Sequence, residues 1–187
     1  MGKNVLVPVA DGSEELEVIC IVDVLRRAGA NTILASVGKL EVIASKGIKL
    51  IADRLVGSCL DDEYDLIALP GGMPGSEHLR DSADLIRLLK RQRAERRLYA
   101  AICAAPAVVL YPHGLLEGRR ATCHPNFAHL VSNVELLDTA VVVDDNCITS
   151  RGAGTAVEFS LTLVEQLYDE EKARQVAKGM AFTRDWT

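Results

Sequence analysis

The stretch Leu98-Tyr-Ala-Ala-Ile-Cys103-Ala-Ala-Pro-Ala-Val-Val-Leu110 decides which fold we expect for this chain. Its first five residues form a short apolar run that predicts a buried strand. Cys103 follows directly, and small residues then open a second apolar run. Pro106 falls where the first turn of a helix tolerates proline, because an N–H group there has no helical partner. The stretch therefore predicts a strand–cysteine–helix corner.

This corner would place the Cys103 thiol at a helix N-terminus, where unpaired N–H groups and the helix dipole favour an anion. The thiolate is the reactive form of cysteine, and such a setting is expected to lower its pKa. Ala101, Ala104 and Ala105 leave the corner sterically open. A buried, inert cysteine in an α/β core is the alternative that these residues alone leave open.

Outward from the corner, strand-like and helix-like segments alternate. We expect strands at 4–10, 31–37, 65–69 and 98–102, a hairpin at 41–51, and shorter β segments at 120–123, 134–137, 140–143 and 147–149. We expect helices at 13–27, with Ser13 as the N-cap, at 83–96, capped by Ser82, at 152–168, and from 170 onward. Continuous apolar strands alternating with helices predict an α/β fold, with a mainly parallel sheet covered on both faces.

Composition limits the class of protein. The chain has 187 residues, 49% of them hydrophobic, which predicts one domain over residues 1–187. Its net charge is −5, so we expect neither nucleic acid nor an acidic membrane as a partner. No apolar run approaches the roughly 20 residues that a membrane span needs, so we expect no membrane insertion.

The cysteines indicate a reducing environment. Their number is five, their spacing is wide and no Cys-x-x-Cys pair occurs, so we expect free thiols. The sequence enters a strand almost at once, so we expect no signal peptide. We therefore expect a cytoplasmic protein, although a trimmed organelle precursor would have the same features.

The first predicted helix is apolar on more than one side. Between Val18 and Leu25, only Asp23 and Cys20 interrupt an aliphatic run. A surface helix normally has a single apolar stripe. We therefore expect a homodimer contact through this helix, and an internal contact with the hairpin at 41–51 is the alternative.

Three predicted strand ends carry candidate chemistry, because ligands bind at the carboxyl ends of strands in such sheets. Glu17 follows the first strand beside the apolar run, where burial would raise its pKa and keep it protonated near neutral pH. Gly71 and Gly72 follow another strand, and with the N–H group of Ala104 they could form an oxyanion hole. An ordinary turn is the alternative for the glycine pair.

His124 ends a short β segment and could act as an acid or a base near neutral pH, unless it is a surface loop residue. The histidines lack the spacing of metal ligands on a helix, so we expect no metal site. The segment 151–155 lacks the lysine and the spacing of a phosphate-binding loop. We expect it to be a helix N-terminus near the site, and we expect no cofactor.

Taken together and in order, the motifs resemble the ThiJ/PfpI superfamily, most closely its parkinsonism-associated deglycase and glyoxalase III branch. The resemblance rests on Gly12-Ser-Glu-Glu-Leu-Glu17, Leu69-Pro-Gly-Gly72, Ala100-Ala-Ile-Cys103-Ala-Ala-Pro106, His124-Pro125 and Thr149-Ser-Arg-Gly-Ala-Gly-Thr155. It covers essentially the whole chain. It implies a flavodoxin-like α/β sandwich and a homodimer.

The resemblance also implies roles for the site residues. Cys103 would be the nucleophile, Glu17 its protonated partner and His124 the nearby base, while Gly72 and Ala104 would donate N–H groups to an oxyanion. The implied reaction converts a small 2-oxoaldehyde, methylglyoxal or glyoxal, to lactate or glycolate through a hemithioacetal on Cys103 without glutathione. Deglycase activity on early aldehyde adducts is also implied.

Two other classes of function remain open at this stage. One is a redox-responsive stress protein or chaperone, in which oxidised Cys103 is the signal. The other is a cysteine peptidase or amidase, which needs a base oriented by a third group. The chain departs from many members at Ala105, Met73 and Ala153, so the resemblance leaves the substrate preference undefined.

Overall fold

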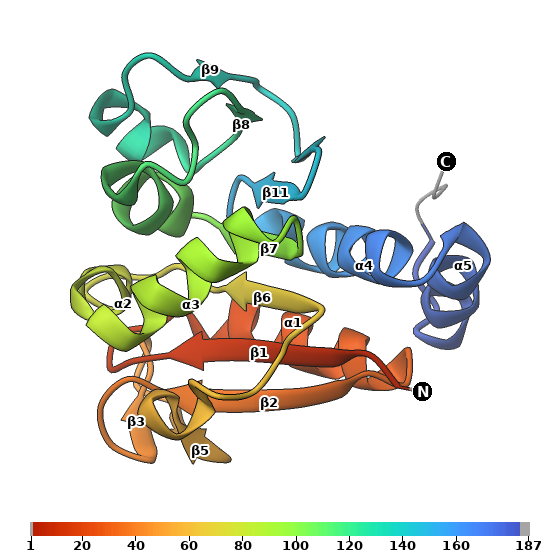
Figure 1. Cartoon of the computed structure of the whole chain (residues 1–187). Helices are drawn as coiled ribbons and strands as arrows, with labels where there is room; N and C mark the ends of the chain where they lie inside the picture. Colours follow the sequence, from red (N-terminus) through yellow and green to blue (C-terminus); the bar gives the residue numbers. More distant parts are fainter. Residues whose placement is uncertain (1, 184–187) are drawn as a thin grey trace.

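A central sheet organises the structure, a computed structural model that describes residues 2–183 (Figure 1). Its strand order is β10-β11-β7-β6-β1-β2-β5, and all neighbours pair in parallel except β10 with β11. The strands are β1 Asn4–Val9, β2 Asn31–Ser36, β5 Arg54–Leu55, β6 Leu66–Leu69, β7 Leu98–Ile102, β10 Val141–Asp144 and β11 Cys147–Ser150. Two small pairs lie outside it, the antiparallel β3 Glu41–Ile43 with β4 Lys49–Ile51, and the parallel β8 Arg120–Ala121 with β9 Glu135–Leu136.

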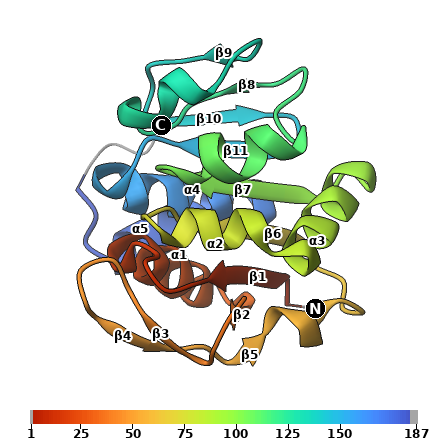
Figure 2. The ribbon, with the colours of Figure 1, turned by 90° about the vertical axis from the view of Figure 1, so that its left-hand side faces the viewer.

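Helices cover both faces of this sheet. The helices α1 Glu15–Arg27 and α4 Ala156–Leu167 pack side by side on one face, and α5 Glu170–Gly179 packs on α4. The other face carries α2 Gly75–Asp81, α3 Ala83–Ala94 and the helical turns Pro106–Leu110 and Tyr111–His113 (Figure 2). The expected flavodoxin-like sandwich with a small hairpin is therefore confirmed.

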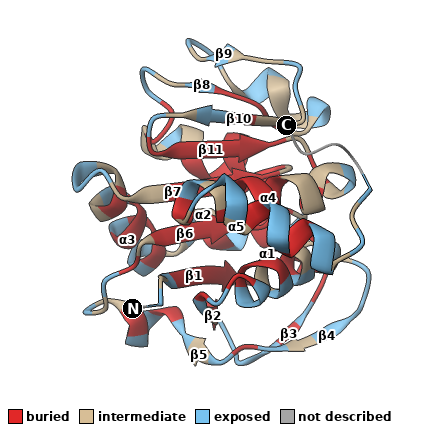
Figure 3. Cartoon of the chain, turned by 90° about the vertical axis from the view of Figure 1, so that its right-hand side faces the viewer, coloured by how far each residue is buried: buried red, intermediate tan, exposed pale blue. Residues whose placement is uncertain are grey.

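The inner strands of the sheet form the buried middle layer, whereas the edge strands β10 and β5 are partly exposed (Figure 3). Alternate residues of β1 point to opposite faces, as the period of a strand requires. Val5, Val7 and Val9 belong to the core beneath α1 and α4, whereas Leu6 belongs to the core beneath α3. These aliphatic layers leave the strand ends as the place where polar groups gather.

Local differences from the expected elements have simple causes. Ser13 is not the N-cap of α1, because its Oγ accepts the N–H group of Ala10 and Glu14 takes the cap position. Ser82 caps α3 as expected, by accepting the N–H group of Leu85. The short elements β5 and α2 were not expected from the sequence, since neither is long enough to show a hydrophobic period.

The outer side of α1 remains uncovered in one chain. Leu16 and Ile19 are 48% and 49% exposed. The hairpin meets the start of the helix, where Ser45 Oγ donates to Glu14 and Glu15. Within residues 2–183, no helix combines the length and the hydropathy needed to cross a bilayer.

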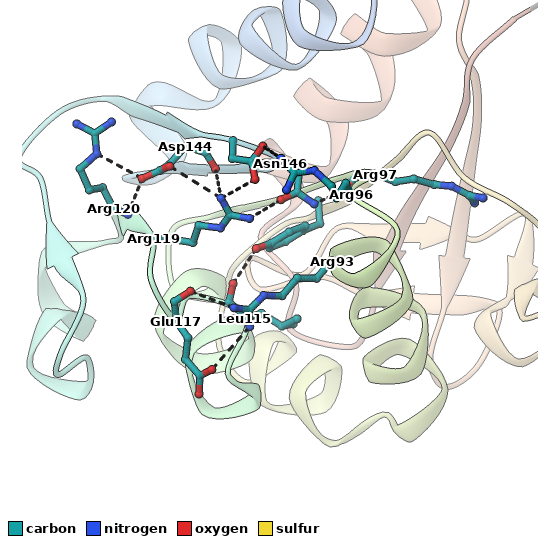
Figure 4. A network of polar contacts seen from close by, with 11 residues as sticks. Arg93, Arg96, Arg97, Leu115, Glu117, Arg119, Arg120, Asp144 and Asn146 are labelled. Carbon is teal, nitrogen blue, oxygen red and sulfur yellow. Dashed lines mark hydrogen bonds and ion pairs between the residues drawn. The ribbon is translucent and has the colours of Figure 1, made fainter.

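A polar network closes the amino end of β7 (Figure 4). The Arg119 guanidinium donates to Asp145 at 2.8 Å and to the Asn146 amide oxygen at 2.7 Å. Asn146 in turn donates to the carbonyl of Arg97, directly before β7. The network fixes the turn between β10 and β11 against the start of β7, opposite the end that carries Cys103.

Candidate active site

Cys103 lies directly after the carboxyl end of β7 in a strained conformation. Its φ is 65°, in the left-handed region that non-glycine residues seldom adopt. Its N–H group donates to the carbonyl of Ser150 at 3.0 Å, and its own carbonyl accepts the N–H group of His124 at 2.8 Å. Hydrogen bonds on both sides therefore hold the strained residue in place.

Glu17 reaches the same point from α1. Its side chain is fully buried, and Oε2 accepts the N–H group of Gly71 at 2.7 Å. Burial raises the pKa of Glu17 to about 7, against the lowering effects of the Gly71 N–H group and the Cys103 thiol. The other carboxyl oxygen receives no N–H or O–H donor, so Cys103 is the remaining polar partner. The carboxyl group therefore exchanges its proton near neutral pH.

The thiol and the carboxyl group form a coupled pair. Burial and an ionised Glu17 together raise the pKa of Cys103 to about 12, against the lowering effect of the N–H groups of Gly72 and Ala104. The expectation that the helix N-terminus lowers this pKa is therefore wrong, because burial and Glu17 outweigh the N–H groups. The pair loses its first proton near pH 7 and its second only near pH 12, so it carries one negative charge over that interval.

The two glycines of the loop after β6 lie too close to neighbouring atoms to carry a side chain. A Cβ on Gly71 would lie 2.6 Å from the Cβ of Cys103, and one on Gly72 would lie 2.4 Å from the backbone nitrogen of Glu14. Gly72 also has a φ of 87°, which favours glycine. The N–H group of Gly71 is directed to Glu17, so the expected oxyanion hole reduces to the N–H groups of Gly72 and Ala104, which interact with the Cys103 sulfur.

The backbone hydrogen bond from His124 to the Cys103 carbonyl places His124 beside Cys103. Its Nδ1 accepts the N–H group of Asn126 at 3.2 Å, so the neutral ring carries its hydrogen on Nε2. The ring of Phe127 packs edge-on against it, with centroids 5.9 Å apart. A Cβ on Gly152 would lie 3.3 Å from His124 Cδ2 and 3.9 Å from Cys103 Sγ. Gly152 therefore lies beside both His124 and Cys103.

Two positioning groups were not found from the sequence. The carbonyl of Ser150 depends on the pairing of β11 with β7, which a single sequence does not reveal. Asn126 follows His124-Pro125, and a histidine that caps the next turn is not a usual capping signal. All five cysteines are free thiols, and residues 2–183 hold no cluster of three potential metal ligands.

Comparison with known proteins agrees with this geometry. The DJ-1/PfpI family model matches residues 3–166. The chain belongs to the DJ-1/PfpI family. This membership confirms the superfamily resemblance drawn from the motifs.

Individual family members are similar over most of this chain. Protein DJ-1 homolog B of Arabidopsis thaliana is 47% identical over 94% of the chain, which spans only 40% of that relative. The glutathione-independent glyoxalase DJR-1.2 of Caenorhabditis elegans is 36% identical over 96% of the chain and of that relative. The solved structure of oxidised Toxoplasma gondii DJ-1 is 44% identical, with a TM-score of 0.95 over 98% of this chain and all of that one.

Proposed function

We propose that this protein is a cofactor-independent glyoxalase that converts methylglyoxal to lactate and glyoxal to glycolate. The observation that carries the proposal is the buried Glu17 carboxyl group beside the strained Cys103, with the pKa of Glu17 raised by burial to about 7. Such a pair offers a nucleophile and a proton carrier at one point. Similarity to a relative named as a glutathione-independent glyoxalase supports the same reaction.

The first step is addition to the aldehyde. With the remaining proton on Glu17, the sulfur carries the charge and receives the N–H groups of Gly72 and Ala104. The sulfur attacks the aldehyde carbon, a C–S bond forms, and the oxygen takes a proton from the Glu17 carboxyl group. The product is a hemithioacetal attached to Cys103.

The second step moves hydrogen between the two substrate carbons. Glu17, now ionised, or His124 removes the proton from C1, and an enediol forms. That proton is returned at C2 and the C1 hydroxyl proton passes to the C2 oxygen, which gives a thioester of the 2-hydroxy acid. Water then hydrolyses the thioester: its hydroxyl joins the acyl carbon, its other hydrogen returns to Glu17, and the C–S bond breaks. The sulfur regains its charge, so the net reaction adds one water to the aldehyde.

Ultraviolet absorbance tests which of the two groups, Cys103 or Glu17, holds the proton before substrate binds. A thiolate absorbs in the ultraviolet, and the difference spectrum between the wild type and Cys103→Ala isolates this cysteine. If the reactive form holds the remaining proton on Glu17, the thiolate signal should rise as the pair loses its first proton, at a pH of about 7. A signal that appears only near pH 12 would place the shared charge on Glu17 and contradict the first step.

Direct detection of the product tests the reaction. We expect wild-type protein to form lactate from methylglyoxal without glutathione in an NMR assay, and Cys103→Ala to reduce the rate to the uncatalysed background. Cys20→Ala, which removes a half-buried thiol of α1, is the matched control and should keep its activity. No lactate from fully reduced wild type would contradict the proposal.

A second candidate function is redox sensing through Cys103. The same N–H groups and a protonated Glu17 would bind the oxygens of a sulfinate, and an oxidised structure of a relative is known. The thiolate would react with two molecules of peroxide, gain two oxygens and release two waters. Mass spectrometry after mild peroxide treatment, together with absent aldehyde turnover, would favour this function.

The peptidase alternative has less support. Nδ1 of His124 accepts a backbone N–H group, so it cannot donate to an orienting carboxylate as a catalytic triad requires. Hydrolysis of peptide or acyl reporters that is lost in Cys103→Ala would revive this alternative.

We also propose that two copies associate through α1. Leu16 and Ile19 are about half exposed on its outer side, and Ile43 of the adjoining hairpin is 50% exposed. Burial of such side chains stabilises an interface by the hydrophobic effect. Sedimentation equilibrium should give a dimer for the wild type and a monomer for Ile19→Glu. A monomeric wild type at micromolar concentration would contradict this proposal.

A further inference from the structure

Gly152 lies in the loop after β11, and its backbone conformation does not require glycine. Its φ of 162° and ψ of −170° are extended, so the backbone conformation alone does not call for glycine. A Cβ here would approach no backbone atom. It would meet His124 Cδ2 at 3.3 Å and Cys103 Sγ at 3.9 Å. The missing side chain therefore leaves space between the two reactive groups and nowhere else.

The loop holds this space in a fixed position. Thr155 donates its backbone N–H group to the Gly152 carbonyl at 2.8 Å, and its hydroxyl donates to the same oxygen at 2.9 Å. The Thr155 hydroxyl oxygen also accepts the Gly152 N–H group at 3.2 Å and lies 2.7 Å from Ser150 Oγ. A side chain at position 152 could not be moved aside without breaking these contacts.

The groups around the space are held as well. His124 is fixed through Nδ1 by Asn126 and through its ring by Phe127, so the imidazole has little freedom to retreat. Glu17 and the N–H groups of Gly72 and Ala104 interact with the same sulfur. The space at Gly152 is therefore the side from which a substituent on the reacting carbon can be accommodated.

We propose that Gly152 is a specificity-determining residue, which admits the substituent of a 2-oxoaldehyde beside Cys103 and His124 and limits its size. The identity of the substrate rests on the glyoxalase proposal, whereas the space itself does not. One added methyl group at this position should discriminate between substituents, because a contact of one methylene changes specificity by roughly 10-fold to 200-fold.

The test compares Gly152→Ala with Gly154→Ala. Gly154 lies in the same loop, and a Cβ there would meet nothing within 4 Å, so it is the matched control. For Gly152→Ala we expect kcat/KM to fall roughly tenfold more for methylglyoxal than for glyoxal, which lacks the methyl group. Gly154→Ala should resemble the wild type. An equal loss for both aldehydes would indicate displacement of His124 and would overturn the proposal.

A second measurement separates this inference from the glyoxalase proposal. Rates of Cys103 modification by peroxide, iodoacetamide and N-ethylmaleimide follow the space beside the sulfur without any aldehyde chemistry. Gly152→Ala should slow the bulky maleimide most and peroxide least, with thermal unfolding unchanged. If wild type forms no lactate but this order holds, only the glyoxalase proposal fails. If the three reagents slow equally, the role of Gly152 fails whatever the reaction.

Discussion

The two ends of β7 are built in opposite ways. At the amino end, the Arg119 cation is paired with Asp145 and Asn146, and the Tyr99 hydroxyl donates to the Leu115 carbonyl at 2.8 Å (Figure 4). At the carboxyl end, Cys103 has a strained φ, and Glu17 has one oxygen without an N–H or O–H donor. The Arg119 guanidinium and the Tyr99 hydroxyl at the first end therefore have hydrogen-bond partners, whereas the reactive groups at the second end are strained or incompletely paired.

In this strand, the residues that stabilise the fold lie at the amino end, and the residues proposed to react lie at the carboxyl end. A buried acid that is incompletely hydrogen-bonded destabilises the folded protein when it ionises. The paired network at the other end contributes stability without entering the site. Substitutions at the two ends should therefore have opposite effects on activity and on the free energy of unfolding.

Among substitutions that keep Cys103, the largest effect should come from Glu17→Gln. The amide can still accept the Gly71 N–H group, but it cannot carry a proton to or from the substrate. We expect kcat for methylglyoxal to fall by roughly 10²–10⁴-fold, the usual contribution of a general acid or base. Stopped assays of lactate measure this loss. Activity within a few-fold of wild type would assign proton transfer to His124 instead.

The same substitution should change the pH dependence of stability. The pKa of Glu17 is about 7 in the folded protein and 4.5 in a model peptide, so folding favours the protonated form. Stability from this group is therefore fully present below pH 4.5 and is lost as the pH rises through about 7. Relative to Glu17→Gln, wild type should lose up to about 3 kcal/mol across this window.

Urea unfolding of both proteins at several pH values measures that difference. Parallel stability curves for the two proteins would contradict a raised pKa for Glu17.

A smaller effect, confined to stability, should follow Arg119→Met. The substitution leaves the Asn146 amide oxygen without its donor and leaves Asp145 paired with Arg96 alone. We expect a cost of about 2 kcal/mol of unfolding free energy. Activity per folded molecule should stay at the wild-type level, because the network is remote from Cys103. Arg174→Ala, which breaks an exposed pair with Glu170 on α5, is the control and should change stability by less than about 0.5 kcal/mol.

Loss of activity in Arg119→Met, with the protein fully folded, would show that the two ends of β7 are coupled. The residues at the amino end of β7 would then affect activity as well as stability.

The sheet, the position of Cys103 and the approach of Glu17 followed from local pattern. Apolar runs predicted the strands, and carboxyl ends of parallel strands must meet at one edge. The cap of α1 was missed because Ser13 bonds back to Ala10 instead of forward into the helix. Local sequence offers Ser13 both bonds, and the packing of the loop decides between them.

The remaining errors in the site concern partners distant in sequence. Gly71 gives its N–H group to Glu17, 54 residues earlier, so its role depends on how two loops dock. The pKa of Cys103 depends on whether that same Glu17 is ionised. Residue types in a motif specify which groups can react, whereas distances between loops determine which group holds the proton.

The hydrogen bond between Glu17 and Gly71 has a consequence for folding. It joins the first helix to the loop after β6, and Cys103 enters only with the next strand. The shared titration near pH 7 therefore exists only when three separate segments of the chain have assembled. During refolding, the appearance of the thiolate would time the completion of the native structure, which makes Cys103 an intrinsic probe that needs no added label.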